Sequence, residues 1–148
     1  MIRYDDGNFY MHNVRFRVPN NFFINCNTES TSNYFIELRP PQNEYILRVR
    51  ILDDCNDTLS EINSYFDEDA GGTPAEPPSV LSVGGMLGHH VIVNGNTVKT
   101  SCYYAHLEMP GCKNKHCYMY IEVKDGKSMM SILESTDIQW FMDNIKHL

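Results

Sequence analysis

The sequence predicts an α+β domain built on a twisted, mainly antiparallel sheet of about five to seven strands, packed against two helices. Short runs in which apolar and polar residues alternate recur along most of the chain, as expected for half-buried strands. Asn94-Gly95 separates two β-branched runs, which is the strongest short-range signal of a hairpin. Two other stretches carry apolar residues at helical spacing.

The clearest strands are expected between residues 88 and 123. Three runs there are predicted to be strands of one antiparallel sheet, His89–Val93, Thr97–Met109 and Cys117–Val123, and the last of them alternates cleanly. The last run predicts one apolar and one polar face, because neighbouring residues of a strand point in opposite directions. Its apolar face would hold Cys117, Met119, Ile121 and Val123, and its polar face Tyr118, Tyr120 and Glu122.

The first half of the chain predicts further antiparallel strands joined by short turns. The run beginning at Val14 ends at Pro19, which cannot donate a hydrogen bond to a neighbouring strand. Further strands are predicted over residues 22–24, 34–39 and 45–52.

Two helices and one flexible loop complete the expected domain, which spans residues 1–148. Thr58-Leu-Ser-Glu61 and Thr136-Asp-Ile-Gln139 are capping boxes, which predict helices over about 58–66 and 136–148. In the second helix the apolar positions continue to Ile145 and Leu148. The segment 69–79 is rich in Gly and Pro and predicts a flexible loop.

Composition restricts the partners and the location of this 148-residue chain. Its net charge of −7 argues against nucleic acid as a partner, because phosphate backbones favour basic surfaces. No apolar run is long enough for a membrane span, and the N-terminus lacks the apolar core of a signal peptide. We therefore expect a cytoplasmic protein, monomeric or homodimeric, whose five cysteines are reduced.

The order of the elements resembles the PsbP-like α/β/α sandwich over most of residues 9–147. The segments that carry this resemblance are Val14-Arg-Phe-Arg-Val-Pro-Asn-Asn-Phe-Phe23, Gly84-Gly-Met-Leu-Gly-His-His-Val-Ile-Val93 and Ile132-Leu-Glu-Ser135. Members of that family are mostly non-enzymatic accessory factors, assembly factors and small binding proteins. The resemblance implies an architecture and a non-catalytic role, and it assigns no functional residue.

A cluster of Cys and His residues offers an enzymatic alternative. Cys112, His116 and Cys117 straddle a turn and are able to converge on a metal, although a fourth ligand is missing. His90 paired with Cys102 or Cys117 is a second arrangement, suited to thiol chemistry. Because neither spacing is typical of a known site, we expect no metal and no cofactor, and we favour a non-enzymatic protein over a small metal- or thiol-dependent enzyme.

The arginines provide the leading functional hypothesis. Five of the six arginines fall on strand positions opposite the apolar residues, and on one sheet they would share a face with two tyrosines. Arginine forks bind carboxylates, so this face predicts a binding or interaction protein for an acidic protein segment or a small anion. The alternative is pairing of these arginines with glutamates on neighbouring strands. The predicted binding residues are Arg15, Arg17, Arg39, Arg48, Arg50, Tyr118 and Tyr120.

Overall fold

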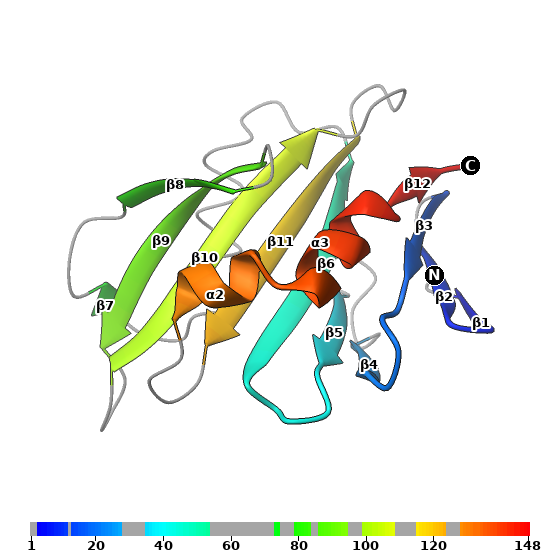
Figure 1. Cartoon of the computed structure of the whole chain (residues 1–148). Helices are drawn as coiled ribbons and strands as arrows, with labels where there is room; N and C mark the ends of the chain where they lie inside the picture. Colours follow the sequence, from blue (N-terminus) through cyan, green and yellow to red (C-terminus); the bar gives the residue numbers. More distant parts are fainter. Residues whose placement is uncertain are drawn as a thin grey trace.

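The described residues of the chain form two antiparallel sheets and two short helices, as seen in a computed structural model (Figure 1). The structure describes residues 3–11, 13–27, 35–53, 73–74, 79–83, 86–94, 99–108, 115–123 and 128–148. The predicted α+β class with one sheet against two helices is therefore wrong, because the protein is mostly β. The antiparallel character of the sheets is confirmed.

The smaller sheet contains four strands in the order β1-β2-β3-β12, and it joins the two ends of the chain. Asp6 and Gly7 connect β1 to β2 with φ values of 48° and 80°, the left-handed conformation that an Asp-Gly hairpin turn requires. This turn and the two strands beside it are not among the elements predicted from the sequence. The strands are β1 (Arg3–Asp5), β2 (Asn8–Met11), β3 (Val14–Arg17) and β12 (Lys146–His147).

The larger sheet follows the order β4-β5-β6-β11-β10-β9-β7, and β8 pairs with β9 beyond the end of β7. The run that begins at Val14 forms β3 of the smaller sheet, and the other predicted strands named above lie in this one. β9 pairs with β10, so the predicted hairpin is confirmed, but Asn94 is itself a paired strand residue opposite Lys99. Its strands are β4 (Phe23–Asn27), β5 (Phe35–Arg39), β6 (Tyr45–Asp53), β7 (Thr73–Pro74), β8 (Ser79–Val83), β9 (Met86–Asn94), β10 (Lys99–Glu108) and β11 (Lys115–Val123).

Helices α2 (Met129–Leu133) and α3 (Thr136–Asp143) lie against one face of the larger sheet (Figure 1). The predicted C-terminal helix is too long, since the chain leaves α3 at Asn144 and enters β12. Its predicted cap is displaced by one residue. The hydroxyl of Ser135, and not that of Thr136, accepts a hydrogen bond from the Ile138 N–H at 3.4 Å.

One apolar core lies between the helices, the smaller sheet and this face of the larger sheet. The alternation read from β11 is confirmed, because its apolar face is part of the core. Three aromatic rings join the smaller sheet to α3. Phe9 stacks on Phe16 with centroids 4.8 Å apart, and Phe16 on Phe141 at 6.0 Å.

Two predictions fall wholly or partly outside the described residues. The helix expected over 58–66 does so entirely. In the loop expected over 69–79, Thr73–Pro74 form β7, which pairs with β9 through Val93 and Asn94, and Ser79 begins β8. Within the described ranges, no helix has the length and apolar character needed to cross a membrane.

Candidate functional site

The predicted arginine face is divided between the two sheets. Arg15 and Arg17 lie on β3 of the smaller sheet, whereas Arg39, Arg48 and Arg50 lie on β5 and β6 of the larger one. The expectation of a single face is therefore wrong. Sequence alternation indicates the side on which a residue lies, but it does not indicate the sheet to which its strand belongs.

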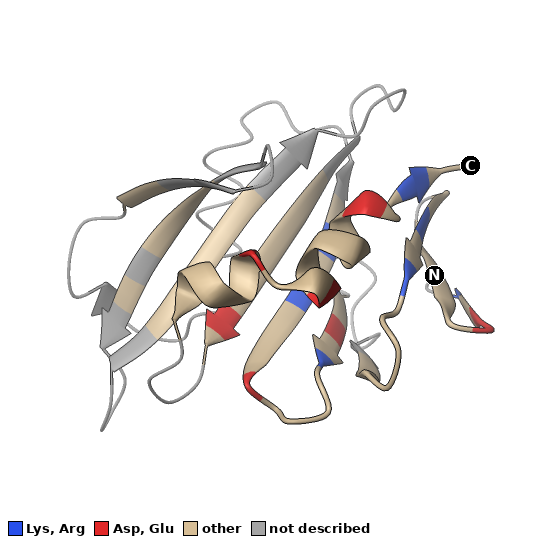
Figure 2. Ribbon diagram, in the orientation of Figure 1, with Lys and Arg blue, Asp and Glu red and all other residues tan. Residues whose placement is uncertain are grey.

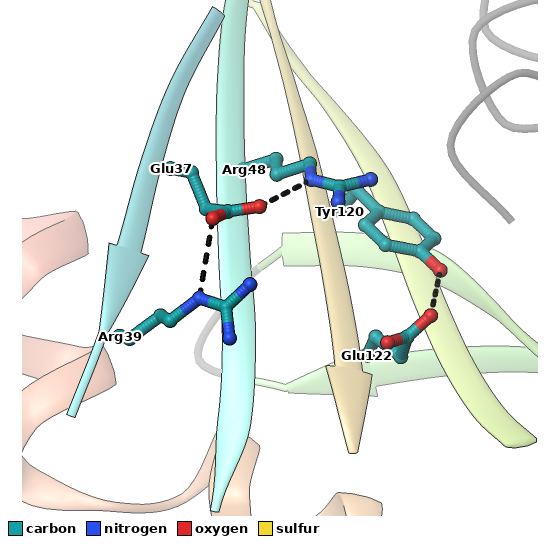
Figure 3. Close-up of polar contacts among 5 residues, drawn as sticks. All are labelled: Glu37, Arg39, Arg48, Tyr120 and Glu122. Atoms are coloured by element: carbon teal, nitrogen blue, oxygen red, sulfur yellow. Dashed lines mark hydrogen bonds and ion pairs between the residues drawn. The ribbon is translucent and has the colours of Figure 1, made fainter. Parts of the chain in front are cut away.

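On the larger sheet, an internal carboxylate lies between two of the predicted arginines (Figure 3). Arg48 donates from Nε to Glu37 Oε1 at 2.9 Å, and Arg39 donates from Nε to Glu37 Oε2 at 3.2 Å. Glu37 is directly opposite Arg48 on neighbouring strands, so this is the cross-strand pairing that was the alternative reading. The pairing already supplies both arginines with an acidic partner.

The rest of that face is also engaged within the protein. Arg50 is 3% exposed, and Tyr118 and Tyr120 are fully buried. The guanidinium of Arg50 lies 4.9 Å from the centroid of the Phe35 ring. Because these side chains are buried, an external partner has no access to them in this conformation.

Tyr120 forms a second buried network beside Arg48. Its hydroxyl donates to Glu122 Oε1 at 3.1 Å and lies 3.2 Å from the sulfur of Cys102 (Figure 3 shows the Glu122 bond). Burial, together with the nearby Cys102 and Glu122, raises the pKa of Tyr120. The phenol therefore stays protonated at neutral pH and serves as a structural hydrogen-bond donor.

The outer face of the smaller sheet presents a different arrangement of cations. Four directly opposed residues cross all four strands, because Arg3 pairs with Tyr10, Tyr10 with Arg15, and Arg15 with Lys146. Strands are about 4.8 Å apart, so this row is roughly 14 Å long. Arg17 lies two residues after Arg15 on the same side of β3. We call these five residues the basic face: Arg3, Tyr10, Arg15, Arg17 and Lys146.

The local sequence explains why these residues point outward. Phe9, Val14 and Phe16 are fully buried in the core, so the alternating positions on β2 and β3 face away from it. The cations of β3 and β12 lie side by side in Figure 2. Acidic residues border this region at the β1–β2 turn, with Asp5 and Asp6, and at the end of α3, with Asp143.

The cations of the basic face have no ion pair among the described residues. No carboxylate there lies within 4.0 Å of Arg3, Arg15, Arg17 or Lys146. Two of them lie against rings instead, Arg3 at 4.4 Å from the centroid of Tyr10 and Arg17 at 5.5 Å from that of Trp140. The Nε of Arg15 is buried without a hydrogen-bond partner in the described part of the chain. An anion on this face would therefore meet cations that no described carboxylate neutralises.

Two of the five basic-face residues, Arg15 and Arg17, are among the binding residues predicted from the sequence, and the other three are not. Arg3 and Tyr10 were overlooked together with β1 and β2, although Asp6-Gly7 is a recognisable hairpin signal. Lys146 was assigned to the C-terminal helix. Nothing in the local pattern indicates that Lys146 pairs with Arg15, because the two residues are far apart along the chain.

The two thiols that the structure describes, those of Cys102 and Cys117, have the environment of core residues. Cys117 is 1% exposed and belongs to the apolar core, where burial raises its pKa to about 12. Burial raises the pKa of Cys102 to about 11, although the hydrogen bond with Tyr120 opposes this shift. Both thiols are therefore protonated at neutral pH, which makes them poor nucleophiles and metal ligands.

The structure describes only part of the remaining Cys and His residues that were candidates for a metal or thiol site. Cys112 lies beyond the described ranges, and of His116 only the backbone is described, so the convergence of these residues with Cys117 stays a prediction. His90 is engaged with Ser101, since its Nε2 lies 2.6 Å from the Ser101 hydroxyl oxygen. Among the described residues, no three His, Cys, Asp or Glu side chains gather in a way that would hold a metal ion.

Comparison with known proteins assigns no family to this chain. No model of a protein family matches it, and no curated protein is similar to it in sequence. The relationship to the PsbP-like family therefore stays a prediction.

Proposed function

We propose that this chain is a non-enzymatic binding protein that holds an acidic protein segment or a small anion on its basic face. The observation that carries the proposal is the row Lys146–Arg15–Tyr10–Arg3, which gathers three cations without a described carboxylate partner. The proposal moves the binding surface from the larger sheet, where Glu37 already engages the arginines, to the smaller one.

The chemistry of the row suits carboxylates and phosphates. Arginine presents a planar fork of donors that matches both groups, and lysine adds a point charge. Tyr10 lies between the cations, where its ring supports the guanidinium of Arg3. In an acidic chain, a concentration of positive charge that no described carboxylate pairs with attracts anions locally, and this attraction weakens as salt screens it.

Direct binding measurements test the proposal. A fluorescent oligoglutamate peptide and inorganic phosphate serve as probes, at low and at physiological salt. We expect oligoglutamate to bind the wild type, and we expect the combined Arg15→Ser and Lys146→Ser substitutions to weaken that binding about tenfold or more at low salt. Arg15→Lys separates charge attraction from recognition by the guanidinium fork, because lysine keeps the charge and lacks the fork.

Arg39→Ser is the matched control for Arg15→Ser. It removes the same charge from a partly exposed arginine, but one that lies on the larger sheet and is paired with Glu37. We expect it to leave binding nearly unchanged. The proposal is overturned if the wild type binds neither probe, or if Arg39→Ser weakens binding as much as Arg15→Ser.

A further inference from the structure

A pocket lies next to the basic face, and Arg17 of that face contacts one of its walls, Trp140. Pro19, Asn20, Thr136, Asp137 and Trp140 line this pocket. Arg17 joins the two regions, because it follows Arg15 on β3 and its guanidinium lies over the Trp140 ring. A ligand that covers the basic face at Arg17 is therefore adjacent to the pocket.

The walls of the pocket suit a flat apolar group. Trp140 is 38% exposed, an unusually large exposure for the one tryptophan of the chain. Pro19 also lines the pocket. Aromatic side chains pack well on such rings and lose little conformational entropy when they bind.

The polar groups of the pocket disfavour a second acidic side chain. Asp137 is exposed in the first turn of α3, and its carboxylate would repel the carboxylate of a glutamate seated beside it. The same carboxylate accepts a hydrogen bond from a phenol or an indole N–H. An acidic ligand that extends into the pocket must therefore be interrupted there by a neutral residue.

We infer that the partner is an acidic peptide segment in which one aromatic residue, with a donor such as the tyrosine hydroxyl, interrupts the run of carboxylates and occupies the pocket beside Trp140. This inference rests on the proposed function, and it selects a peptide over a small anion. Carboxylates lie along the basic face, and the aromatic ring packs on Trp140 and Pro19.

The test is a panel of oligoglutamate peptides in which tyrosine replaces each glutamate in turn, with alanine replacements as charge-matched partners. For at least one position we expect the tyrosine peptide to bind the wild type about tenfold more tightly than its alanine partner. Trp140→Ala should abolish that preference, and Trp140→Phe should retain most of it. Asp137→Asn should strengthen binding of the uninterrupted oligoglutamate several-fold, because it removes the like charge.

The outcomes separate this inference from the function on which it rests. If oligoglutamate binds through the basic face but no tyrosine position exceeds its alanine partner, the inference fails and the proposed function stands. A tyrosine preference that persists in Trp140→Ala also overturns the inference. If phosphate binds but no peptide does, only the inference fails. If neither phosphate nor any peptide binds, the proposed function itself fails. Circular dichroism and the midpoint of thermal unfolding verify that each variant is folded.

Discussion

The ring of Tyr103 lies directly over the Cα of Gly88, on the neighbouring strand of the larger sheet. The two residues are diagonal neighbours, because Tyr103 pairs with His90 and Ala105 pairs with Gly88. A Cβ atom at Gly88 would overlap the hydroxyl oxygen, Cζ and Cε2 of the tyrosine. Only glycine fits at position 88, because the ring occupies the volume that any other side chain would need.

Gly88→Ala should destabilise the protein by about 2 kcal/mol or more, because the new methyl group meets a ring that is fully buried. Urea unfolding measures this loss. Tyr103→Leu in the same background should recover part of it, since the smaller side chain leaves the methyl group room. An unchanged unfolding midpoint in Gly88→Ala would show that the ring does not lie where the structure places it.

Two tyrosine-to-phenylalanine substitutions should have opposite effects on stability. The Tyr103 hydroxyl is buried without a hydrogen-bond partner in the described part of the chain, so Tyr103→Phe should stabilise the protein by about 1 kcal/mol. Tyr120→Phe should destabilise it by about 1–2 kcal/mol, because it removes the donor to Glu122. Chemical denaturation compares the two variants, and changes of the same sign would contradict this assignment of hydrogen bonds.

Glu37→Gln should cost about 2–4 kcal/mol of unfolding free energy. Glu37 is a nearly buried carboxylate that accepts from two arginines, and its loss leaves the Arg48 charge in a partly buried site without that partner. Arg39→Ser is the control. It removes the more exposed member of the network and should cost less than 1 kcal/mol. Equal losses of unfolding free energy in the two variants would indicate that Glu37 does not stabilise both Arg39 and Arg48.

The buried thiols should make the protein less stable at alkaline pH. The pKa of Cys102 is raised from its usual 9.0 to about 11 in the folded state, so the unfolded chain loses this proton first as the pH rises. The contribution of this thiol to the free energy of unfolding is complete below pH 9 and is lost as the pH rises through its folded pKa. The free energy of unfolding falls over this range by at most about 1.4 kcal/mol per pH unit. Urea unfolding of the wild type and of Cys102→Ala from about pH 7 to pH 11 measures the difference in slope. Parallel curves would show that Cys102 does not titrate in this way.

Ser135→Ala should destabilise the protein by about 1 kcal/mol, because Ser135 is the N-cap of α3 and its hydroxyl also donates to the Ile132 carbonyl at 2.6 Å. Thr136→Ala is a matched control one residue later, at the position that the capping-box pattern favoured. Its effect should lie within about 0.5 kcal/mol of zero. Thermal unfolding distinguishes the two variants. A larger loss of stability in Thr136→Ala than in Ser135→Ala would show that Thr136 is the N-cap, as the sequence predicts.

The sequence by itself determined which residues of several strands face the core. In β6 and β11 the alternation identified Leu47, Val49, Met119 and Ile121 as core residues, and all of them are buried. The prediction was correct because side chains of a strand alternate between its two sides. Apolar residues at every second position therefore identify the buried side from a short stretch of sequence. It failed at the C-terminus, where the apolar spacing of α3 continued into residues that pair with β3 instead.

Only the tertiary structure decided which strands lie side by side, and with them the candidate site. Arg48 pairs with Glu37 because β6 lies beside β5, and Arg15 lies between Tyr10 and Lys146 because β3 separates β2 from β12. Alternation places a residue on one side of a strand, but strand pairing depends on non-local contacts that no short window of sequence contains. Two arginines with similar local patterns, Arg15 and Arg48, therefore have different environments: Arg15 lies in a row of cations and Arg48 in an internal ion pair.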